Sequence, residues 1–290
     1  MSVIRYTSAH AFLAAAEPLL MMAEAENNLI IGVTRGLARN PPSPEASARQ
    51  VLSENNRYLA TSGEDERVLA CGAYIAPFKL MITRANREPI AALARDAFTA
   101  VPGLEGVTGP DRSAADFAAA WSKSSGVPPR IGMRLRIHET RGVTDSGLSR
   151  PPGRLRKAME DDLERLCAWT ETFVAEAKLP EKVDAKVVVA GGIKSGRLHV
   201  WDDEGPASMA AWAGKTPSGV RLNFVYTPPE RRGKGYATAC VSALTRQQLA
   251  LGNAFCWLYT DLASGASPKI FKRIGYRPVS DVTEYYLRPT

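Results

Sequence analysis

The stretch VYTPPERRGKGYA, residues 225–237, decides the fold of this 290-residue chain. It follows the apolar run 219–226, which has the composition of a strand, and leads into 234–251, where apolar side chains recur at helical spacing. Two glycines and three cations stand at this junction: Arg231, Arg232, Gly233, Lys234 and Gly235. A helix N-terminus carries unpaired N–H groups and partial positive charge, and glycine lets the backbone approach a ligand closely. The junction therefore has the chemistry of a phosphate-binding loop.

Of three phosphate-binding motifs, the junction matches one. A Walker loop requires G-x-x-x-x-G-K-[ST], but Pro228 stands at its first glycine and Gly235 at its hydroxyl position. A Rossmann G-x-G-x-x-G would need glycine at Thr238 and an acidic residue ending a second parallel strand. The pattern [RQ]-x-x-G-x-[GA] is matched in full from Arg232 to Ala237.

This third pattern resembles the pyrophosphate loop of the GNAT N-acetyltransferase superfamily. Residues 255–279, FCWLYTDLASGASPKIFKRIGYRPV, resemble the strand, helix and strand that follow that loop in the superfamily, and the resemblance covers roughly 154–287. It implies that this half of the chain binds acetyl-CoA. By resemblance, the cofactor-binding residues are Val225, Tyr226, Thr227, Arg231, Arg232, Gly233, Lys234, Gly235, Tyr236, Ala237, Thr238, Ser264 and Phe271.

The first half looks like a degenerate copy of the second. Residues 57–74 and 197–213 both read as strand, acidic turn and strand, but 84–98, RANREPIAALARDAF, has no glycine between strand and helix. A Gly-, Pro- and Ser-containing linker at 141–153 separates the halves. We expect an α/β (α+β) tandem acyl-CoA N-acyltransferase (GNAT) fold, with a mixed central sheet and flanking helices in each half. Its domains would be 1–140, without a CoA loop, and 154–290, the catalytic domain, giving one cofactor site per chain.

Apolar spacing predicts the flanking elements of the second half. A helix is expected after Pro152, with Leu155, Met159 and Leu163 on its buried face, and AKVVVAGG at 185–192 reads as a strand. The hairpin turn is expected at DDEG, residues 202–205. Short strands, YRPV and TEYYLRP, are expected to close the second half.

Composition narrows the class of protein. The net charge of +7 is a mild surplus, and the basic stretch 134–141 lacks clustered aromatic partners, so we expect no nucleic-acid partner. Four cysteines without C-x-x-C spacing and three dispersed histidines predict reduced core thiols and no metal site. The apolar segment 11–26 is broken by Glu17 and Pro18, which favours a packed helix over a signal peptide. A cytoplasmic protein without a membrane partner is the expectation.

The resemblance also implies the chemistry, which is attack of an amine on a thioester. A backbone N–H near Val225 or Tyr226 would polarise the thioester carbonyl. Carboxylates near the expected cleft that could accept the amine's proton are Asp202, Glu204 and Glu230. Many superfamily members have a tyrosine as general acid where this chain has Phe271, which cannot donate a proton.

Three alternatives for the acid stay open. Tyr259 or Tyr276 could substitute for the missing tyrosine, the thiolate could leave unassisted, or catalysis could be weak. We expect an N-acetyltransferase acting on a primary amine of a small molecule or peptide, as a monomer or homodimer. The alternative is an acyl-CoA-binding sensor or scaffold with little turnover.

Overall fold

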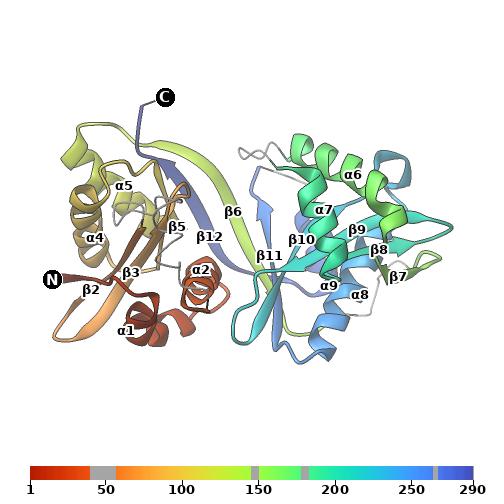
Figure 1. Ribbon diagram of the computed structural model, residues 1–290, viewed down its shortest axis with the longest axis horizontal. Coiled ribbons are helices and arrows are strands. Elements are labelled where there is room, and N and C mark those ends of the chain that lie inside the picture. Colours follow the sequence, from red (N-terminus) through yellow and green to blue (C-terminus); the bar gives the residue numbers. More distant parts are fainter. Residues whose placement is uncertain (40–56, 145–149, 178–182, 264–266, 290) are drawn as a thin grey trace, which may run out of the picture. The chain divides into compact units, whose positions relative to one another are not determined.

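The computed structural model describes residues 1–39, 57–144, 150–177, 183–263 and 267–289 (Figure 1). The chain divides into two compact units: unit 1 contains Met1–Ile137, Asp261–Ala263 and Val279–Thr290, and unit 2 contains His138–Thr260 and Ser264–Pro278. This division differs from the expected 1–140 and 154–290 at two places. The described parts of the expected linker, 141–144 and 150–153, belong to unit 2, and the C-terminal segment belongs to unit 1.

The elements of the first half follow one order along the chain. They are β1 Ser2–Arg5, α1 Ala9–Met21, α2 Asn28–Arg39, β2 Arg57–Glu64, β3 Arg67–Ile75, β4 Leu80–Ile82, α4 Arg87–Ala100, β5 Gly106–Pro110, α5 Asp111–Ser125 and β6 Arg130–Thr140. The N-terminal apolar segment forms α1, whose side chains Phe12, Ala16 and Leu20 are buried. None of the described helices combines the length and the apolar character that crossing a bilayer requires.

The second half repeats that order of strand, two helices, three strands, helix, strand, helix and strand. Its elements are β7 Arg154–Lys157, α6 Leu163–Glu176, α7 Ala185–Lys194, β8 Leu198–Asp202, β9 Pro206–Ala213, β10 Gly219–Tyr226, α8 Tyr236–Ala250, β11 Phe255–Asp261, α9 Ser267–Ile274 and β12 Arg277–Tyr286. Short 3-10 turns at Glu160–Asp162 and Pro229–Arg231 precede α6 and α8.

Local geometry supports the reading of two copies. The hairpin β2–β3 turns through Asp65 and Glu66, and the hairpin β8–β9 through Glu204 and Gly205, all four with positive φ. In each half three antiparallel pairings are followed by one parallel pairing, β4 with β5 and β10 with β11. The expected mixed sheet with flanking helices in each half is therefore confirmed.

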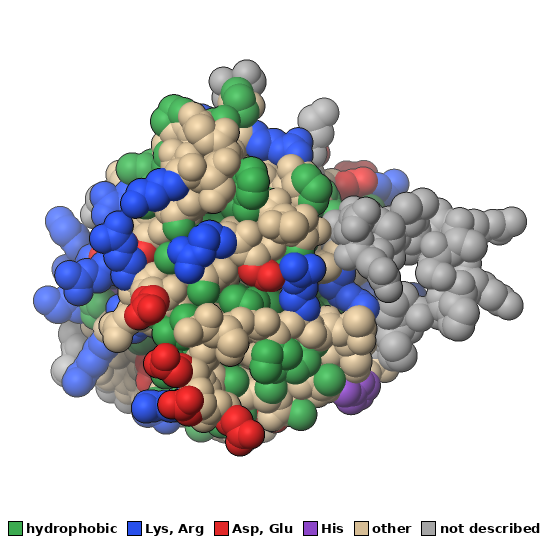
Figure 2. Space-filling model, turned by 90° about the vertical axis from the view of Figure 1, so that its left-hand side faces the viewer, with side chains coloured by type: hydrophobic (Ala, Val, Ile, Leu, Met, Phe, Trp, Pro, Cys, Tyr) green, Lys and Arg blue, Asp and Glu red, His purple; other side chains and the backbone are tan. Residues whose placement is uncertain are grey.

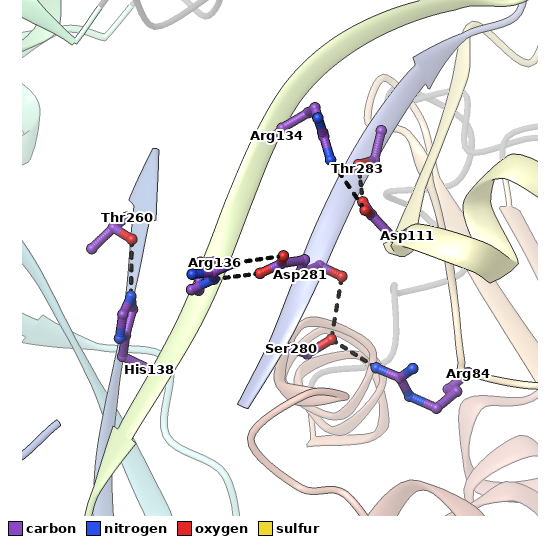
Figure 3. A network of polar contacts seen from close by, with 9 residues as sticks. All are labelled: Arg84, Asp111, Arg134, Arg136, His138, Thr260, Ser280, Asp281 and Thr283. Carbon is purple, nitrogen blue, oxygen red and sulfur yellow. Dashed lines mark hydrogen bonds and ion pairs between the residues drawn. The ribbon is translucent and has the colours of Figure 1, made fainter. Parts of the chain in front are cut away.

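The last strand of the chain completes the sheet of unit 1. Residues Val282–Tyr286 of β12 pair antiparallel with Gly106–Pro110 of β5. The two short strands expected at YRPV and TEYYLRP are therefore one strand, Arg277–Tyr286, which starts in unit 2 and ends in unit 1. A polar contact joins this strand to β6 within unit 1. Arg136 of β6 donates hydrogen bonds to both carboxylate oxygens of Asp281, at 2.6 and 2.8 Å (Figure 3). In unit 2 the end of β6 lies beside β11, where His138 Nε2 and Thr260 Oγ1 are 3.0 Å apart (Figure 3).

Two hydrophobic clusters cover the two faces of the unit 2 sheet. One contains Val220, Leu222, Cys256 and Leu258 of β10 and β11 with side chains of α8 and α9. The other contains Val200 and Met209 of β8 and β9, with side chains of α6 and α7. Helices α6 and α7 therefore pack on one face, and α8 and α9 on the other.

Two sequence expectations in this unit were wrong. AKVVVAGG belongs to helix α7, because the Asp184 carboxylate caps its N-terminus by accepting from Val187 N at 3.0 Å. Its burial repeats every four residues, with Ala185 and Val189 buried, whereas Val187 is 68% exposed. The expected helix after Pro152 starts at Leu163, and Leu155 lies in strand β7 instead.

Candidate functional site

Strands β10 and β11 are hydrogen-bonded along their first residues and then diverge. Their parallel register runs from Gly219 opposite Phe255 to Arg221 opposite Trp257. On its other side β10 pairs with β9, and the register shifts between Asn223 and Tyr226. Phe224 within this bulge has φ +49°, a value rare for a residue with a side chain. A bulge takes backbone out of the ladder and re-aims it, and such features gather beside functional sites.

The loop after β10 delivers the backbone to the N-terminus of α8. Gly233 and Gly235 have φ of +78° and +87°, in the left-handed region that glycine tolerates. Gly235 is the N-cap of α8, and no side chain in the described part of the chain caps that end. Among the described residues, a Cβ added to Gly233 would meet nothing within 4 Å. The open space and the uncapped N–H groups fit a phosphate group.

A pocket of about 580 Å³ lies at this junction in unit 2. The residues lining it are Phe173, Glu176, Ala177, Val225, Tyr226, Thr227, Arg231, Arg232, Gly233, Gly235, Tyr236, Ala237, Thr238, Ile270, Phe271 and Arg273. Helices α6 and α9, which pack on opposite faces of the sheet, both contribute to it. The pocket therefore extends past β10 from one face of the sheet to the other.

Most of the predicted cofactor-binding residues line this pocket. The exceptions are Lys234, which is not among the lining residues, and Ser264, which lies outside the described residues. The motif identified a contiguous loop, so its members come together through local chain geometry. Residues contributed by the helices, Glu176 and Arg273, were missed because their approach to the loop depends on tertiary packing.

Three arginines and one glutamate set the charge of the described lining. Arg231 belongs to the loop, and Arg273 belongs to α9. Arg232 is held by neighbours, since its Nε donates to the Thr227 carbonyl at 2.8 Å and its Nη2 to both oxygens of Glu176 at 2.9 and 2.8 Å. Hydrogen bonding to Glu176 raises the pKa of Arg232. The lining carries a net positive charge, which suits an anionic ligand.

The first turn of α8 is tied to the hairpin β8–β9. The hydroxyl of Tyr236 donates a hydrogen bond to the Asp203 carboxylate, and this bond raises the pKa of Tyr236. The ring of Tyr226 packs near Trp169 of α6, with 6.0 Å between ring centroids, beneath the Arg232 guanidinium at 5.6 Å. These contacts hold the loop against both the hairpin and α6.

The structure brings few of the predicted catalytic side chains to the pocket. Tyr226 lines it, whereas Glu230 and Tyr259 are not among its lining residues. Tyr276 is a core residue, since it is 1% exposed and its hydroxyl lies 2.8 Å from Thr245 Oγ1. Burial raises the pKa of Tyr276. Phe271, at the position where superfamily members have the acid, lies on the pocket wall and packs edge-on against Tyr276.

The two other carboxylates considered as bases also lie off the pocket. Asp202 accepts from Arg156 Nε at 2.6 Å and from Gly205 N at 2.8 Å. Glu204 occupies the hairpin turn with φ +52°. Neither is among the lining residues. The sequence predicted the hairpin turn at 202–205, but it could not predict the ion pair of Asp202, because Arg156 lies 46 residues away in the chain.

The corresponding strands of unit 1 stay close together. A Cβ on Gly109 of β5 would come within 2.6 Å of the Ile82 side chain and 2.8 Å of its carbonyl oxygen, so β4 and β5 are in contact beyond their ladder.

A smaller pocket of about 340 Å³ lies between α4 and α5, lined by Arg87, Arg95 and Lys123 among others. Figure 2 shows a face of unit 1 on which Lys and Arg side chains gather at one edge.

Comparisons with known proteins relate this arrangement to others. Residues 201–286 match the family model described as FR47-like protein. An acetyltransferase of the GNAT family from Colwellia psychrerythraea has a TM-score of 0.55 and 10% identity, over 99% of this chain and 100% of its own. A Drosophila protein has a TM-score of 0.62 and 11% identity, over 99% and 98%. No curated protein sequence matches the chain.

A third solved structure agrees with these. The GCN5-related N-acetyltransferase from Sphaerobacter thermophilus has a TM-score of 0.55 and 16% identity, over 99% of this chain and 96% of its own. Sequence identities as low as these support a similarity of fold alone. The chain therefore has the fold of the GNAT acetyltransferases over nearly its whole length, and its residues 201–286 resemble the FR47-like family.

Proposed function

We propose that this protein transfers an acyl group, acetyl in the simplest case, from coenzyme A to a primary amine. The observation that supports it best is the junction of β10 and α8. There an uncapped 15-residue helix, two left-handed glycines and a cationic lining meet at the point where β10 and β11 part. A donor with phosphates at one end and a narrow acyl-bearing arm at the other matches such a site.

The residues that would hold the phosphates belong to the loop and to α9. Backbone N–H groups of Tyr236, Ala237 and Thr238 lie in the first turn of α8, where helix geometry leaves them without intrahelical acceptors. Arg231 and Arg273 would add charge-assisted hydrogen bonds. Arg232 would do so by exchanging its contact with Glu176 for one with a phosphate.

The transfer itself needs a positioned amine and a stabilised oxygen. The amine nitrogen attacks the thioester carbonyl carbon, the new C–N bond forms, and the C–S bond breaks with its electron pair on sulfur. The amine loses one proton, and the thiolate ends as a thiol. Backbone groups of the bulged segment near Val225 and Tyr226 are the proposed donors to the oxygen that becomes negative.

In this proposal, water accepts the proton of the amine, and the thiolate leaves without help from a general acid. Among the described lining residues Glu176 supplies the carboxylate, and both its oxygens accept from Arg232. Phe271 has no proton to give. A thiol pKa of about 8.5 makes the thiolate a tolerable leaving group near neutral pH.

The same features favour a second candidate, an acyl-CoA-binding sensor or scaffold with little turnover. One experiment separates the two. Acetyl-CoA binding is measured by calorimetry, and thiol release is followed with a panel of primary amines. Saturable binding with amine-dependent thiol release supports the transferase, and binding without release on any amine supports the sensor. If acetyl-CoA does not bind, both candidates are wrong.

A further inference from the structure

The bulge in β10 turns its side chains from one face of the sheet to the other. Val220 and Leu222 pack in the cluster formed with α8 and α9. Alternation along an undisturbed strand would point Phe224 the same way, but its ring centroid lies 5.6 Å from that of Phe173 on α6. Tyr226 also packs in the cluster formed with α6 and α7. The bulge therefore directs two aromatic rings of β10 toward α6.

These rings belong to an aromatic patch of four side chains: Trp169 and Phe173 of α6, and Phe224 and Tyr226 of β10. Trp169 packs near Tyr226, and Phe173 packs near Phe224. Tyr226 is 5% exposed, whereas the other three are partly exposed. Phe173 and Tyr226 line the pocket, and Phe224 directly precedes Val225, another lining residue. The aromatic patch is therefore contiguous with the backbone that is proposed to bind the thioester oxygen.

The donor of the proposed reaction would reach this backbone from the other face of the sheet. The phosphate loop leads into α8, and Ile270 and Phe271 of α9 line the pocket on the side of α8. A donor that lies along these residues presents its thioester near Val225 and leaves the α6 side of the pocket open. The amine must attack the carbonyl carbon from space that the donor does not fill. The aromatic patch therefore borders the path of the acceptor.

The charges of the described lining disfavour a second cation on the acceptor. A polyamine or a lysine-rich peptide would need carboxylates that are free to pair with it. The described lining offers Glu176, and both of its oxygens accept from Arg232, at 2.9 and 2.8 Å. An apolar ring, by contrast, gains free energy when it covers partly exposed aromatic side chains, both by burial and by ring packing. The lining on this side therefore favours an aromatic acceptor.

We propose that the acceptor is a primary amine bearing an aromatic ring, which packs against Phe173 and Phe224 while the amine reaches the thioester near Val225. This inference rests on the proposed acyl transfer. The nitrogen forms the new C–N bond and gives up one proton, and the electron pair of the C–S bond leaves on sulfur, which ends as a thiol. The product is an N-acyl arylalkylamine. Phe173 determines the specificity, because it lines the pocket and contacts Phe224.

The test compares amines that differ in the ring. Thiol release from acetyl-CoA is measured with phenethylamine, ethylamine and putrescine, at equal concentrations of neutral amino groups. We expect kcat/KM to be about 10- to 100-fold higher for phenethylamine than for either other amine, the range for burying one aromatic group. Equal kcat/KM values for the three amines, or a preference for putrescine, would overturn the aromatic acceptor while leaving the transferase itself in place.

Variants of α6 assign the preference to the aromatic patch. Phe173→Ala should remove most of the preference for phenethylamine, and Phe173→Leu should retain part of it, because leucine keeps apolar surface at that position. The ratio of two amines cancels any effect of a variant on acetyl-CoA affinity or on the folded fraction. Val174→Ala, at a partly exposed position of α6 outside the described lining, should keep the full preference. An unchanged preference in Phe173→Ala would contradict the assignment.

A second measurement covers the case of slow turnover. Calorimetry in the presence of coenzyme A measures binding of N-acetylphenethylamine and of N-ethylacetamide to the full chain and to Phe173→Ala. Tighter binding of the aromatic amide, lost in Phe173→Ala, supports the inference, and no binding and no turnover of either compound overturns it. A preference that follows the acyl group, with phenylacetyl-CoA used better than acetyl-CoA whichever amine is offered, also overturns it. Absence of acetyl-CoA binding overturns the proposed function itself, so the two failures are distinguishable.

Discussion

Arg232 and Glu176 form an ion pair on the wall of the pocket, in which one guanidinium nitrogen donates to both carboxylate oxygens at 2.9 and 2.8 Å. Arg232 belongs to the loop and Glu176 to the C-terminal end of α6. A negative ligand would compete with Glu176 for this guanidinium. The pair therefore opposes binding of the phosphates that the loop is proposed to accept, while it holds the loop against α6.

Glu176→Gln is predicted to tighten coenzyme A binding about two- to fivefold. The variant removes one negative charge from the pocket and frees Arg232, and exposed pairs of this kind contribute about 0.2–1 kcal/mol. Both side chains are nearly half exposed, at 47% and 46%, which keeps the effect small. Calorimetric titration gives the affinity, and Glu171→Gln, an exposed residue of the same helix, is the control. Weaker binding in Glu176→Gln would show that the pair shapes the loop for its ligand.

The proposed phosphate loop can be tested with a matched pair of glycines. Gly233 and Gly252 both have positive φ, +78° and +91°, and a Cβ at either would meet no atom of the described residues within 4 Å. Glutamate at either position should therefore cost a similar free energy of unfolding, about 1–2 kcal/mol for the left-handed backbone. Gly233 lines the pocket and Gly252 does not, so Gly233→Glu should lower coenzyme A affinity at least about tenfold through charge repulsion.

The outcome is read from chemical denaturation and calorimetry together. Gly235→Glu, at the N-cap of α8, should behave like Gly233→Glu in the binding experiment. Equal coenzyme A affinity in Gly233→Glu and Gly252→Glu would contradict the assignment of the loop. If both variants lose the same stability and bind coenzyme A equally well, the assignment of the loop is also contradicted.

Tyr276→Phe is predicted to change stability and not turnover. The hydroxyl lies 2.8 Å from Thr245 in the core, and Thr245 keeps its second bond to the Val241 carbonyl at 2.7 Å. Losing one buried hydrogen bond should lower the free energy of unfolding by about 1 kcal/mol. Urea unfolding and thiol release on the same preparations test this. A large fall in kcat with unchanged stability would restore Tyr276 as the general acid.

The sequence predicted the site well where the signal is local. Gly233, Gly235 and the uncapped start of α8 follow one another in the chain, so strand, loop and helix could be recognised together. It failed where tertiary packing decides. Val187 and Val188 favour a strand by their branched side chains, yet Asp184 caps a helix there and one face of that helix is buried.

The placement of the last strand could not be predicted for a similar reason. The sequence TEYYLRP predicts a strand, but it does not specify which strand pairs with it. The strand that pairs with Val282–Tyr286 is β5 of the first half. Likewise the spacing of α9 does not distinguish a surface arginine from one on the pocket wall, and Arg273 is on that wall. Tyr276 was a plausible acid by proximity in sequence, but it points into the core.

Arg156→Met is predicted to lower the free energy of unfolding by about 3 kcal/mol. The guanidinium binds Asp162 through Nη1 and Nη2 at 2.6 and 2.9 Å and Asp202 through Nε at 2.6 Å. The Asp162 side chain is 6% exposed, and removing one partner of a buried pair leaves an uncompensated charge. Arg154→Met, at an exposed position of the same strand, should cost less than about 0.5 kcal/mol. Similar losses in both variants would contradict this ranking.

His199 is predicted to make the protein less stable as the pH falls below about 6.5. The residue is 2% exposed on β8, and Nδ1 lies 3.3 Å from the Arg197 carbonyl oxygen. Its Nε2 has no hydrogen-bond partner among the residues that the structure describes. Burial lowers its pKa, the nearby Lys157 lowers it further, and the Arg197 carbonyl opposes both.

The sign follows from the protons bound by each state. Above about pH 6.5, the ordinary pKa of histidine, both states are neutral and the full stability is present. Below it the unfolded chain binds a proton that folded His199 resists, so the free energy of unfolding falls with pH. Urea unfolding between pH 7.5 and 5.5 should show this fall in the wild type and in the control His10→Gln, which alters an exposed residue of α1. In His199→Gln the fall should be smaller, because the titrating group is gone, and an unchanged pH dependence in that variant would rule out His199 as its source.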